Sequence, residues 1–410
     1  MKGFLLVSVI KMLVVFTVIM VGVALLTLME RKVSAWMQNR RGPNRVGPAG
    51  LLQPAADGLK NILKEETFPA LANRWLFLLA PAMSFIPALL LSAVIPFGAP
   101  LPLDFDFTLG PLGQFVHQGP MPLVVADLPI GFLFVLAISS MGVYGIALAG
   151  WSSNSKYSLL GGLRASAQMV SYEVPLALSL IPVLLLAGNV NFSAIVQGQQ
   201  AGLWYVLPLF LSFFIFLISG LAETNRVPFD LPEAEAELIA GYHTEYSAMK
   251  FSFFFIAEYA NVVTVCAMVT TLFFGGWDIP FTRWDESGGV WQTLATAASF
   301  FVKVMFWIFF VMWIRWTLPR FRYDQLMALG WKVLLPLALA YIMVICVAIY
   351  VLDRFTGLTD PITQSLGLFG LNVVIAVLVF GLLDRGVFVR GSARQRRALE
   401  ATARRPQVVT

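Results

Sequence analysis

The amino-acid sequence predicts an all-α protein that crosses a membrane several times, and two observations carry this prediction. First, 58% of the 410 residues are hydrophobic and only 12% are charged, whereas a soluble domain carries about 25% charged residues. Second, apolar runs of about 20 residues, the length that spans roughly 30 Å of hydrocarbon as a helix, recur along the chain. A water-soluble globule is therefore excluded, and so is a disordered chain, because apolar side chains are abundant.

Nine apolar segments are long enough to be membrane-spanning helices. We expect these polytopic helices at roughly 4–29, 75–97, 123–149, 166–188, 204–222, 251–275, 292–314, 333–352 and 366–383. The first is not a cleavable signal peptide, because it is too long, contains Lys11 and ends in Glu30-Arg31-Lys32. We divide the chain into a membrane domain of eight spans, 1–353, and a ninth span with an Arg-rich tail, 354–410.

The positively charged residues lie mostly on one side of these spans. Segments after the first, third, fifth, seventh and ninth spans hold 23 of the 28 Lys and Arg residues, and the opposite side holds 3. The positive-inside rule therefore predicts an external N-terminus and a cytoplasmic C-terminus. Because the basic residues lie between apolar runs, the net charge of +5 does not indicate a nucleic-acid partner. The Arg-rich tail favours the inner membrane of a bacterium over a mitochondrion.

The first cytoplasmic segment contains a short amphipathic helix. Between Pro54 and Glu65 the apolar residues recur at helical spacing, opposite a polar face of Asp57, Lys60, Asn61 and Lys64. The helix is too short and too charged to span the bilayer, so we expect it to lie in the interface plane. Its simplest role is a surface anchor. Alternatively, it is one wall of a site that an amphiphilic substrate enters from the lipid.

The third cytoplasmic segment, about 223–250, is unusually acidic. Against Arg226 and Lys250 it holds six acidic residues: Glu223, Asp230, Glu233, Glu235, Glu237 and Glu245. Closely spaced carboxylates in a partly dry setting cannot all stay ionised, so we expect some of them to exchange protons. A solvated acidic face is the alternative, and the pattern alone does not decide between the two.

Five ionisable residues fall inside the apolar runs: Lys11, Asp127, Glu173, Glu258 and Lys303. A charge at the centre of a spanning helix costs at least about 2.5 kcal/mol, so such residues are functional by default. Lys11 and Asp127 lie near span ends, where their charged groups can reach water. Glu173, Glu258 and Lys303 lie deeper and have the composition of a proton relay, in which Lys303 is expected to pair with a carboxylate.

Several kinds of chemistry are not indicated by this sequence. Cys266 and Cys346 have no CxxC spacing, and His117 and His243 have no second ligand at metal spacing, so no metal site is predicted. The chain also contains no phosphate-binding loop, no dinucleotide fingerprint and no nucleophile elbow. ATP-driven transport and nicotinamide binding are therefore not encoded here.

Four motifs closely resemble those of a known family. They read GPNRVGPAGLLQPAADGLK (42–60), GLRASAQMVSYEV (162–174), LAETNRVPFDLPEAEAELIAGYHTEYS (221–247) and PRFRYDQLMALGWK (319–332). The family is the H subunit of the proton-pumping NADH:quinone oxidoreductase, respiratory complex I, called NADH dehydrogenase subunit one in mitochondria. The similarity runs from about 25 to 340. Eight spans are common in that family, so the ninth departs from its pattern.

The resemblance implies that the chain docks the peripheral arm of the complex and walls a quinone chamber that opens to the lipid. The implied quinone-chamber residues are Arg31, Arg40, Arg41, Asp57, Lys60 and Phe229. The implied proton-coupling residues, to which we add Lys303, are Glu173, Glu223, Arg226, Asp230, Glu233, Glu235, Glu237, Glu245 and Glu258. The implied interface with the peripheral arm consists of Arg315, Arg320, Arg322 and Asp324.

The resemblance also implies where the redox chemistry takes place. Quinone is the substrate, flavin mononucleotide (FMN) and iron–sulfur clusters are held by partner subunits, and this chain binds no cofactor and has no catalytic residue. The implied partners are the peripheral-arm quinone-site subunits and the adjacent membrane subunits. Two alternatives stay open: a homologous subunit of a membrane-bound hydrogenase or a ferredoxin- or F420-linked dehydrogenase, and a stand-alone ion transporter. The quinone-type entrance motif disfavours the first, and the second predicts transport by this chain alone.

Overall fold

Long apolar helices form the body of the protein. The computed structural model describes residues 2–384, apart from 103–104, 109–113, 118, 231–238, 281, 283, 285–288 and 357–360. Within this part of the chain, eight helices are long and apolar enough to cross a membrane. The protein is therefore an all-α polytopic membrane protein, as its composition predicts.

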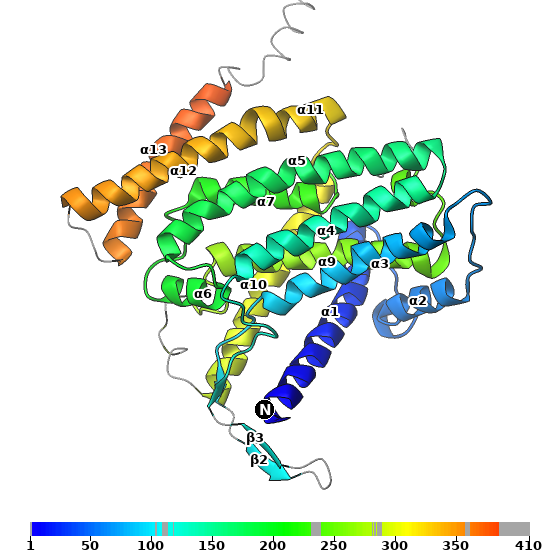
Figure 1. The fold of residues 1–410 in the computed structure, drawn as a ribbon, viewed down its shortest axis with the longest axis horizontal. Coiled ribbons are helices and arrows are strands. Elements are labelled where there is room, and N and C mark those ends of the chain that lie inside the picture. Colours follow the sequence, from blue (N-terminus) through cyan, green and yellow to red (C-terminus); the bar gives the residue numbers. More distant parts are fainter. Residues whose placement is uncertain are drawn as a thin grey trace, which may run out of the picture.

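The spanning helices follow the predicted apolar segments. Six of them are α1 (Lys2–Met37), α3 (Arg74–Leu90), α4 (Gly131–Ser152), α5 (Lys156–Ala187), α9 (Ala248–Phe273) and α10 (Val290–Thr317). The seventh consists of α11 (Tyr323–Ala328) and α12 (Leu335–Val351), joined by a π-helical segment, and the eighth is α13 (Pro361–Asp384). Figure 1 shows α3, α4 and α5 side by side, with α1 and α10 inclined steeply to them.

The fifth apolar segment is shorter than predicted. We expected a spanning helix over 204–222, but α7 covers only Phe210–Glu223. Its 14 residues rise about 21 Å, which is less than the roughly 30 Å of a hydrocarbon core. Pro208 lacks an N–H group and disfavours helical backbone at the residue before it, and the residues before Phe210 form turns. The prediction of nine full-length helices is therefore wrong at this segment.

Two further helices in the described part of the chain are too short to span a membrane. The amphipathic helix is present as α2 (Gln53–Leu63), with Pro54 in its first turn, as the sequence predicts. An additional helix, α6 (Phe192–Gln200), follows α5, and its first turn is capped by the side chain of Asn191, which accepts from the Ala194 amide. Single helical turns occur at Pro48–Gly50, Leu91–Val94 and Gly241–His243.

Two small antiparallel strand pairs lie between α3 and α4 in the chain. β1 (Leu101–Pro102) pairs with β4 (Pro120–Met121), and β2 (Phe105–Thr108) pairs with β3 (Gln114–His117). In the second pair Phe105 lies opposite His117. The hairpins extend below the helices beside the N-terminus in Figure 1.

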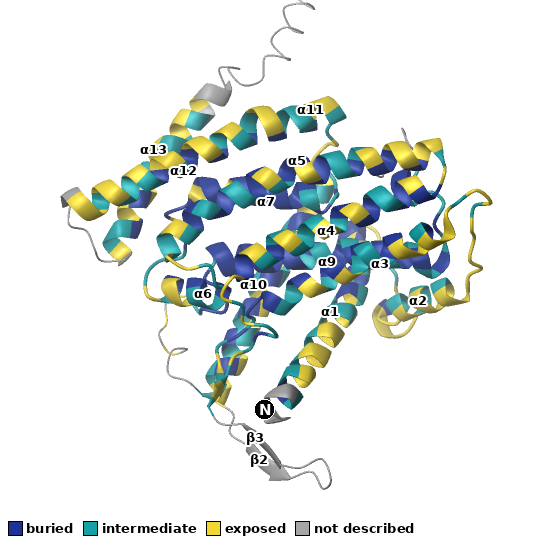
Figure 2. Ribbon diagram, viewed as in Figure 1, coloured by how far each residue is buried: buried dark blue, intermediate teal, exposed yellow. Residues whose placement is uncertain are grey.

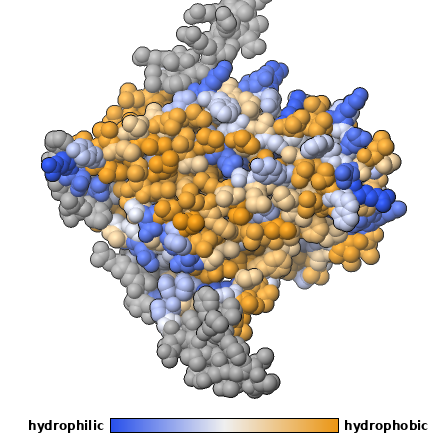
Figure 3. Space-filling model, viewed as in Figure 1, coloured by the Kyte–Doolittle hydropathy of each residue, from blue (hydrophilic) through white to orange (hydrophobic). Residues whose placement is uncertain are grey.

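The interior contains one large apolar core and one smaller one. The large core packs α5, α7, α9, α10 and α12 together, and the smaller one packs Phe77, Tyr246 and Phe254 between α3, α4, α5 and α9. Figure 2 shows that α9 is mostly buried, whereas α2 and the N-terminal half of α1 are largely exposed. The surface in Figure 3 is mainly apolar, with hydrophilic residues near its upper and right edges. A surface of this kind suits contact with lipid or with other membrane subunits.

Candidate functional site: a buried ion network between two cavities

A network of charges joins α1, α9, α10 and the segment after α7. Arg226 lies at its centre, with Nη1 2.9 Å from Oε2 of Glu30 on α1 and Nε 2.7 Å from Oε1 of Glu258 on α9. The Tyr259 hydroxyl donates to Oε2 of Glu30 at 2.6 Å. Arg315 of α10 pairs with the other oxygen of Glu30. Two carboxylates and two guanidiniums, far apart in the sequence, therefore meet in one place.

Burial makes this network energetically important. The side chains of Arg226 and Glu30 are only 5% and 7% exposed, and buried charges are tolerated only when they are paired. The guanidinium carbon of Arg226 also lies 3.9 Å from the centre of the Tyr259 ring, a cation–π contact. Burial acts to lower the pKa of Arg226, but the carboxylates of Glu258 and Glu30 outweigh it and hold that pKa above its ordinary value. Arg226 therefore stays positively charged.

A cavity of about 230 Å³ lies against the network. It is lined by residues of α1, α9 and α10 together with Arg226: Thr27, Glu30, Arg31, Ser34, Arg226, Phe255, Glu258, Tyr259, Arg315 and Trp316. The lining combines aromatic rings with hydrogen-bonding and charged groups. Ligand-binding pockets commonly combine apolar and aromatic side chains with a few polar groups.

A second cavity, of about 30 Å³, also borders Glu258. Its polar lining includes Ser84, Asn225, Asn261 and Glu223, and a polar space of this volume holds one water molecule. Glu223 interacts electrostatically with Glu173 of α5. The structure thus brings Glu258, Glu223 and Glu173 into one series, with Glu258 shared between the two cavities.

Helix α2 is linked by an ion pair to Arg31, which lines the large cavity. Nη1 of Arg31 lies 2.6 Å from Oδ2 of Asp57, and the amide of Gln53 donates to the other oxygen of Asp57. Nζ of Lys60 lies 3.9 Å from Asp57. None of the residues of α2, all of which the structure describes, is buried. The structure therefore brings Arg31, Asp57 and Lys60 together.

Helix α5 positions the acidic segment. The amide nitrogen of Gln168 donates to the carbonyl oxygens of Ala222, at 2.8 Å, and Phe229, at 2.7 Å. At the other end of the segment, Gly161 packs against the turn at Gly241, where a Cβ on Gly161 would lie 2.6 Å from the Gly241 Cα. Gly241 itself adopts a φ of 60°, a conformation that glycine reaches without strain.

The predicted arm-facing motif is connected to the acidic segment. Nη2 of Arg320 lies 2.7 Å from Oδ2 of Asp230, and the Phe321 amide donates to the Pro228 carbonyl at 3.1 Å. The ring of the buried Phe229 lies between those of Tyr172 and Phe321, with centroid distances of 5.6 and 5.5 Å. Phe229 thus belongs to this junction and does not line the large cavity.

The remaining predicted residues lie apart from the network. Arg40 and Arg41 lie in an exposed turn, Arg322 and Asp324 are exposed at the start of α11, and Glu245 is half-buried before α9. Glu233, Glu235 and Glu237 lie outside the described residues. Lys303 donates to three carbonyl oxygens, those of Phe274, Gly276 and Asp278.

Sequence reasoning missed three residues of this region. Glu30 and Tyr259 complete the network, and Lys250 ties α9 to the segment before α3 through an ion pair with Glu66 at 3.2 Å. Glu30 carried a usable signal, since it is an acid at the end of an apolar run beside Arg31. Tyr259 adjoins the singled-out Glu258, but a tyrosine in a spanning helix is too common to be diagnostic. Tyr246, which lies just before α9, is also buried. Burial raises the pKa of the Tyr246 hydroxyl to about 12, so this hydroxyl stays protonated.

No metal centre is found in the described part of the chain. There, no group of three or more His, Cys, Asp or Glu side chains could hold a metal ion. His243 makes edge contacts with the rings of Tyr242 and Phe251.

Comparisons with known proteins agree on one family. A family model described as NADH dehydrogenase matches residues 10–346. The chain is 53% identical to the second H subunit of NADH-quinone oxidoreductase of Koribacter versatilis, over 83% of this chain and 96% of the relative. It is 51% identical to the first H subunit of NADH-quinone oxidoreductase of Geobacter metallireducens, over 82% and 94%. It is also 51% identical to NADH-ubiquinone oxidoreductase chain 1 of Chondrus crispus, over 83% and 96%.

Proposed function

Because this chain belongs to the family of NADH-quinone oxidoreductase H subunits, we propose that it walls the quinone chamber and couples quinone reduction to proton movement. Membership makes it a membrane subunit of that complex, with other complex I subunits as partners. The relatives are named for quinone or ubiquinone, which favours this function over the hydrogenase-type and transporter alternatives. From the charge distribution, we place it in a bacterial inner membrane with its N-terminus outside.

The large cavity and α2 support the chamber proposal. Leu59, Ile62 and Leu63 of α2 are all more than half exposed, so in a membrane they contact lipid. Arg31 lines the cavity and is paired with Asp57 on α2. An apolar approach thus adjoins a charged and aromatic interior. This gradient fits a molecule with a long apolar tail and a polar redox-active ring, such as quinone.

The position of Glu258 is the observation that carries the coupling proposal. Its carboxylate is paired with Arg226, borders the large cavity and borders the small cavity that contains Glu223. Quinone reduction takes up protons, and we propose that this changes the charge at Glu258 and Glu30. Arg226 then redistributes its interaction between the two carboxylates, and the change passes through Glu223 to Glu173 and the adjacent membrane subunits. In this scheme Glu233, Glu235, Glu237 and Glu245 supply protons.

The docking surface for the peripheral arm is proposed at Arg320, Arg322 and Asp324. All three are exposed at the cytoplasmic end of α10 and α11, and Arg320 is paired with Asp230 of the acidic segment. Movement of the arm is thereby transmitted to the segment that holds Arg226. FMN and iron–sulfur clusters are assigned to the partner subunits. Since the family model ends at 346, we treat 354–410 as an addition to the shared domain.

Replacement of Glu258 by Gln tests the coupling proposal. The amide keeps the size and hydrogen-bonding shape of the side chain but cannot exchange a proton. We expect the reconstituted complex to lose both quinone-reductase rate and proton uptake by tenfold or more, about 1.4 kcal/mol at the transition state. Glu66→Gln is the matched control, because Glu66 is also ion-paired but lies outside both cavities. Full pumping at normal electron flux in Glu258→Gln would overturn the proposal.

The chamber itself is tested by photo-crosslinking with an azido-quinone in the intact complex. Labelling of residues near 27–34 or 255–259, prevented by a rotenoid inhibitor, is the expected result. Labelling that the inhibitor does not prevent, or labelling confined to other subunits, would contradict a chamber wall in this chain.

A further inference from the structure

A large apolar groove lies between α12 and α13. Its volume is about 510 Å³, and every described residue that lines it is apolar. On α12, Val344, Val347 and Val351 recur at a spacing of three and four residues and form one stripe along the helix. On α13, Gly367 and Leu371 are four residues apart and lie on the facing side. The groove is therefore built from the facing sides of two helices.

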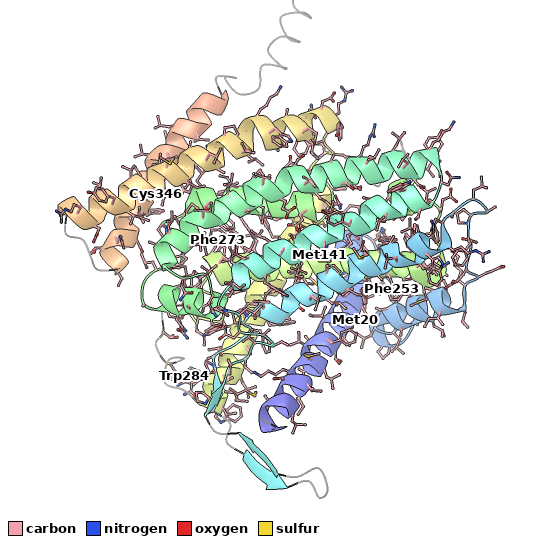
Figure 4. The ribbon with its side chains drawn as sticks, in the orientation of Figure 1. Met20, Met141, Phe253, Phe273, Trp284 and Cys346 are labelled. Atoms are coloured by element: carbon pink, nitrogen blue, oxygen red, sulfur yellow. The ribbon has the colours of Figure 1, made fainter. Side chains whose placement is uncertain are left out.

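The inclination of α13 to α12 leaves this space between them. At one end of the groove Gly367 lies close to the Leu352 side chain, where a Cβ on Gly367 would be 3.2 Å from Cδ2. Toward the other end, the Tyr341 hydroxyl donates to Oδ1 of Asn372 at 2.7 Å. These contacts are 11 residues apart along the seventh spanning helix but only 5 apart on α13, rises of about 16 and 8 Å. The two helices therefore do not run parallel, and Figure 4 shows α13 crossing the part of α12 where Cys346 lies.

The groove extends through about one leaflet of a bilayer. Its lining runs along the seventh spanning helix from Met343 to Leu352, a separation that rises about 13 Å. Half of a hydrocarbon core of roughly 30 Å is about 15 Å. Asp353 and Arg354 follow Leu352 directly and are both exposed. The charge distribution predicts that this end of the helix is outside, so we expect the two charged groups at the headgroup level of the outer leaflet.

We propose that the groove binds one acyl chain of a phospholipid of the outer leaflet, with the phosphate of that lipid at Arg354. The groove is open to the surface, because Met343 and Val347 are 67% and 58% exposed. In a membrane this surface contacts hydrocarbon chains, and a chain that lies in the groove gains close contacts with both helices. At the outer end, a guanidinium binds phosphate through two parallel hydrogen bonds, and Asp353 suits the ammonium group of a zwitterionic headgroup.

Two observations favour lipid over a neighbouring subunit as the occupant. First, α13 lies beyond the family model, which ends at 346, and the Koribacter relative matches over 96% of its own length but over only 83% of this chain. Subunits that bind the shared domain therefore need no surface on α13. Second, a helix of another subunit would cross the whole hydrocarbon core, whereas the groove has the depth of one leaflet and ends beside a phosphate-binding cation. This inference does not depend on the quinone proposal.

The test is photo-crosslinking of the intact complex in proteoliposomes that contain phosphatidylethanolamine with a diazirine in one acyl chain. Unlabelled lipid is added in excess, the samples are irradiated after increasing delays, and the labelled positions are mapped by peptide mass spectrometry. Label between 343 and 352 should be lost about tenfold more slowly than label at Val374 and Val377, the ratio that corresponds to about 1.4 kcal/mol of tighter binding. These two reference residues are 57% and 67% exposed on α13 and lie outside the groove.

Variants of the groove and of its outer end separate a bound chain from bulk lipid. Ala348→Phe fills the groove and should abolish the slow loss of label. Ala340→Phe is the matched control, because Ala340 is exposed on the same helix and lies outside the groove. Arg354→Gln removes the partner of the phosphate and should speed the loss of label severalfold.

Equal rates of loss at the groove and at Val374 in the unsubstituted complex would overturn the proposal. Absence of label from the groove before dilution would also overturn it, because another subunit would then cover the groove. If the complex with Ala348→Phe does not accumulate, Val347→Phe decides, since Val347 lines the groove and is exposed enough to accept a larger side chain. Loss of the slow component in Val347→Phe supports the proposal, and an unchanged slow component refutes it.

Discussion

Replacing Arg226 by Met should strongly shorten the lifetime of the assembled complex. The guanidinium lies within 2.9 Å of carboxylate oxygens on both Glu30 and Glu258. Removing one partner of a buried ion pair costs about 3–5 kcal/mol, since the remaining charge stays buried without compensation. Glu30 keeps its contacts with Tyr259 and Arg315, so we use the lower limit, about 3 kcal/mol.

The assay is the half-life of the purified complex at a temperature where the wild type loses activity over hours. If the network opens in the rate-limiting step, about 3 kcal/mol shortens the half-life roughly 100-fold. Arg226→Lys keeps the charge, but one nitrogen cannot pair with acids on α1 and α9 together, so we expect a loss of about half that free energy. Adding Glu258→Gln to Arg226→Met also removes the negative charge that faced the lost guanidinium on α9 and should lengthen the half-life again.

A half-life for Arg226→Met that matches the wild type would refute this reasoning. So would the absence of any rescue by Glu258→Gln, because the energetic argument depends on stranded charge and not on the lost side-chain volume.

Two further predictions concern the scaffold and the entrance. Gly161→Ala places a methyl group 2.6 Å from the Gly241 Cα and should lower stability by about 1–3 kcal/mol through overpacking. The rate of thermal inactivation measures this loss. Gly22→Ala is the control and should be neutral, because a Cβ there would have nothing within 4 Å. Asp57→Ala removes the partner of Arg31 and should raise the KM for long-chain quinone more than its kcat changes. Lys64→Ala, at the exposed end of α2, is the control, and an unchanged KM for short and long quinones would refute a role for Asp57 at the entrance.

The apolar spans, α2 and the family were all predictable from the sequence, because hydrophobic runs and long motifs are local signals. The fifth span was only partly predictable from the sequence. Its hydrophobicity extends over 204–222, but hydropathy reports the environment of a segment and not its backbone conformation. Pro208 disfavours helical backbone only in its immediate vicinity. The non-helical stretch is stabilised by Gln199, a few residues before it, and by the end of α9, which is distant in sequence.

The candidate site was predicted as a set of residues but not as an arrangement. Glu258 and Arg226 were both singled out, yet their pairing depends on the packing of α9 against the segment after α7. Glu30 was missed as a site residue because an acid at a span end is ordinarily solvated, whereas here α9 and α10 cover it. The main-chain carbonyls that bind the ammonium of Lys303 carry no sequence signature.

The final helix, α13, gives the segment before α7 an order of assembly. The amide of Asn372 on α13 donates to the Pro208 carbonyl at 2.5 Å and its oxygen accepts from Tyr341 at 2.7 Å, in a site that is 1% exposed. Asn372 leaves the ribosome more than 160 residues after Pro208. The segment before α7 therefore receives this hydrogen-bond donor only when translation is nearly complete. Insertion of α13 thus completes a contact at the outer end of the fifth apolar segment. Chains that end before α13 would lack this contact during quality control in the membrane.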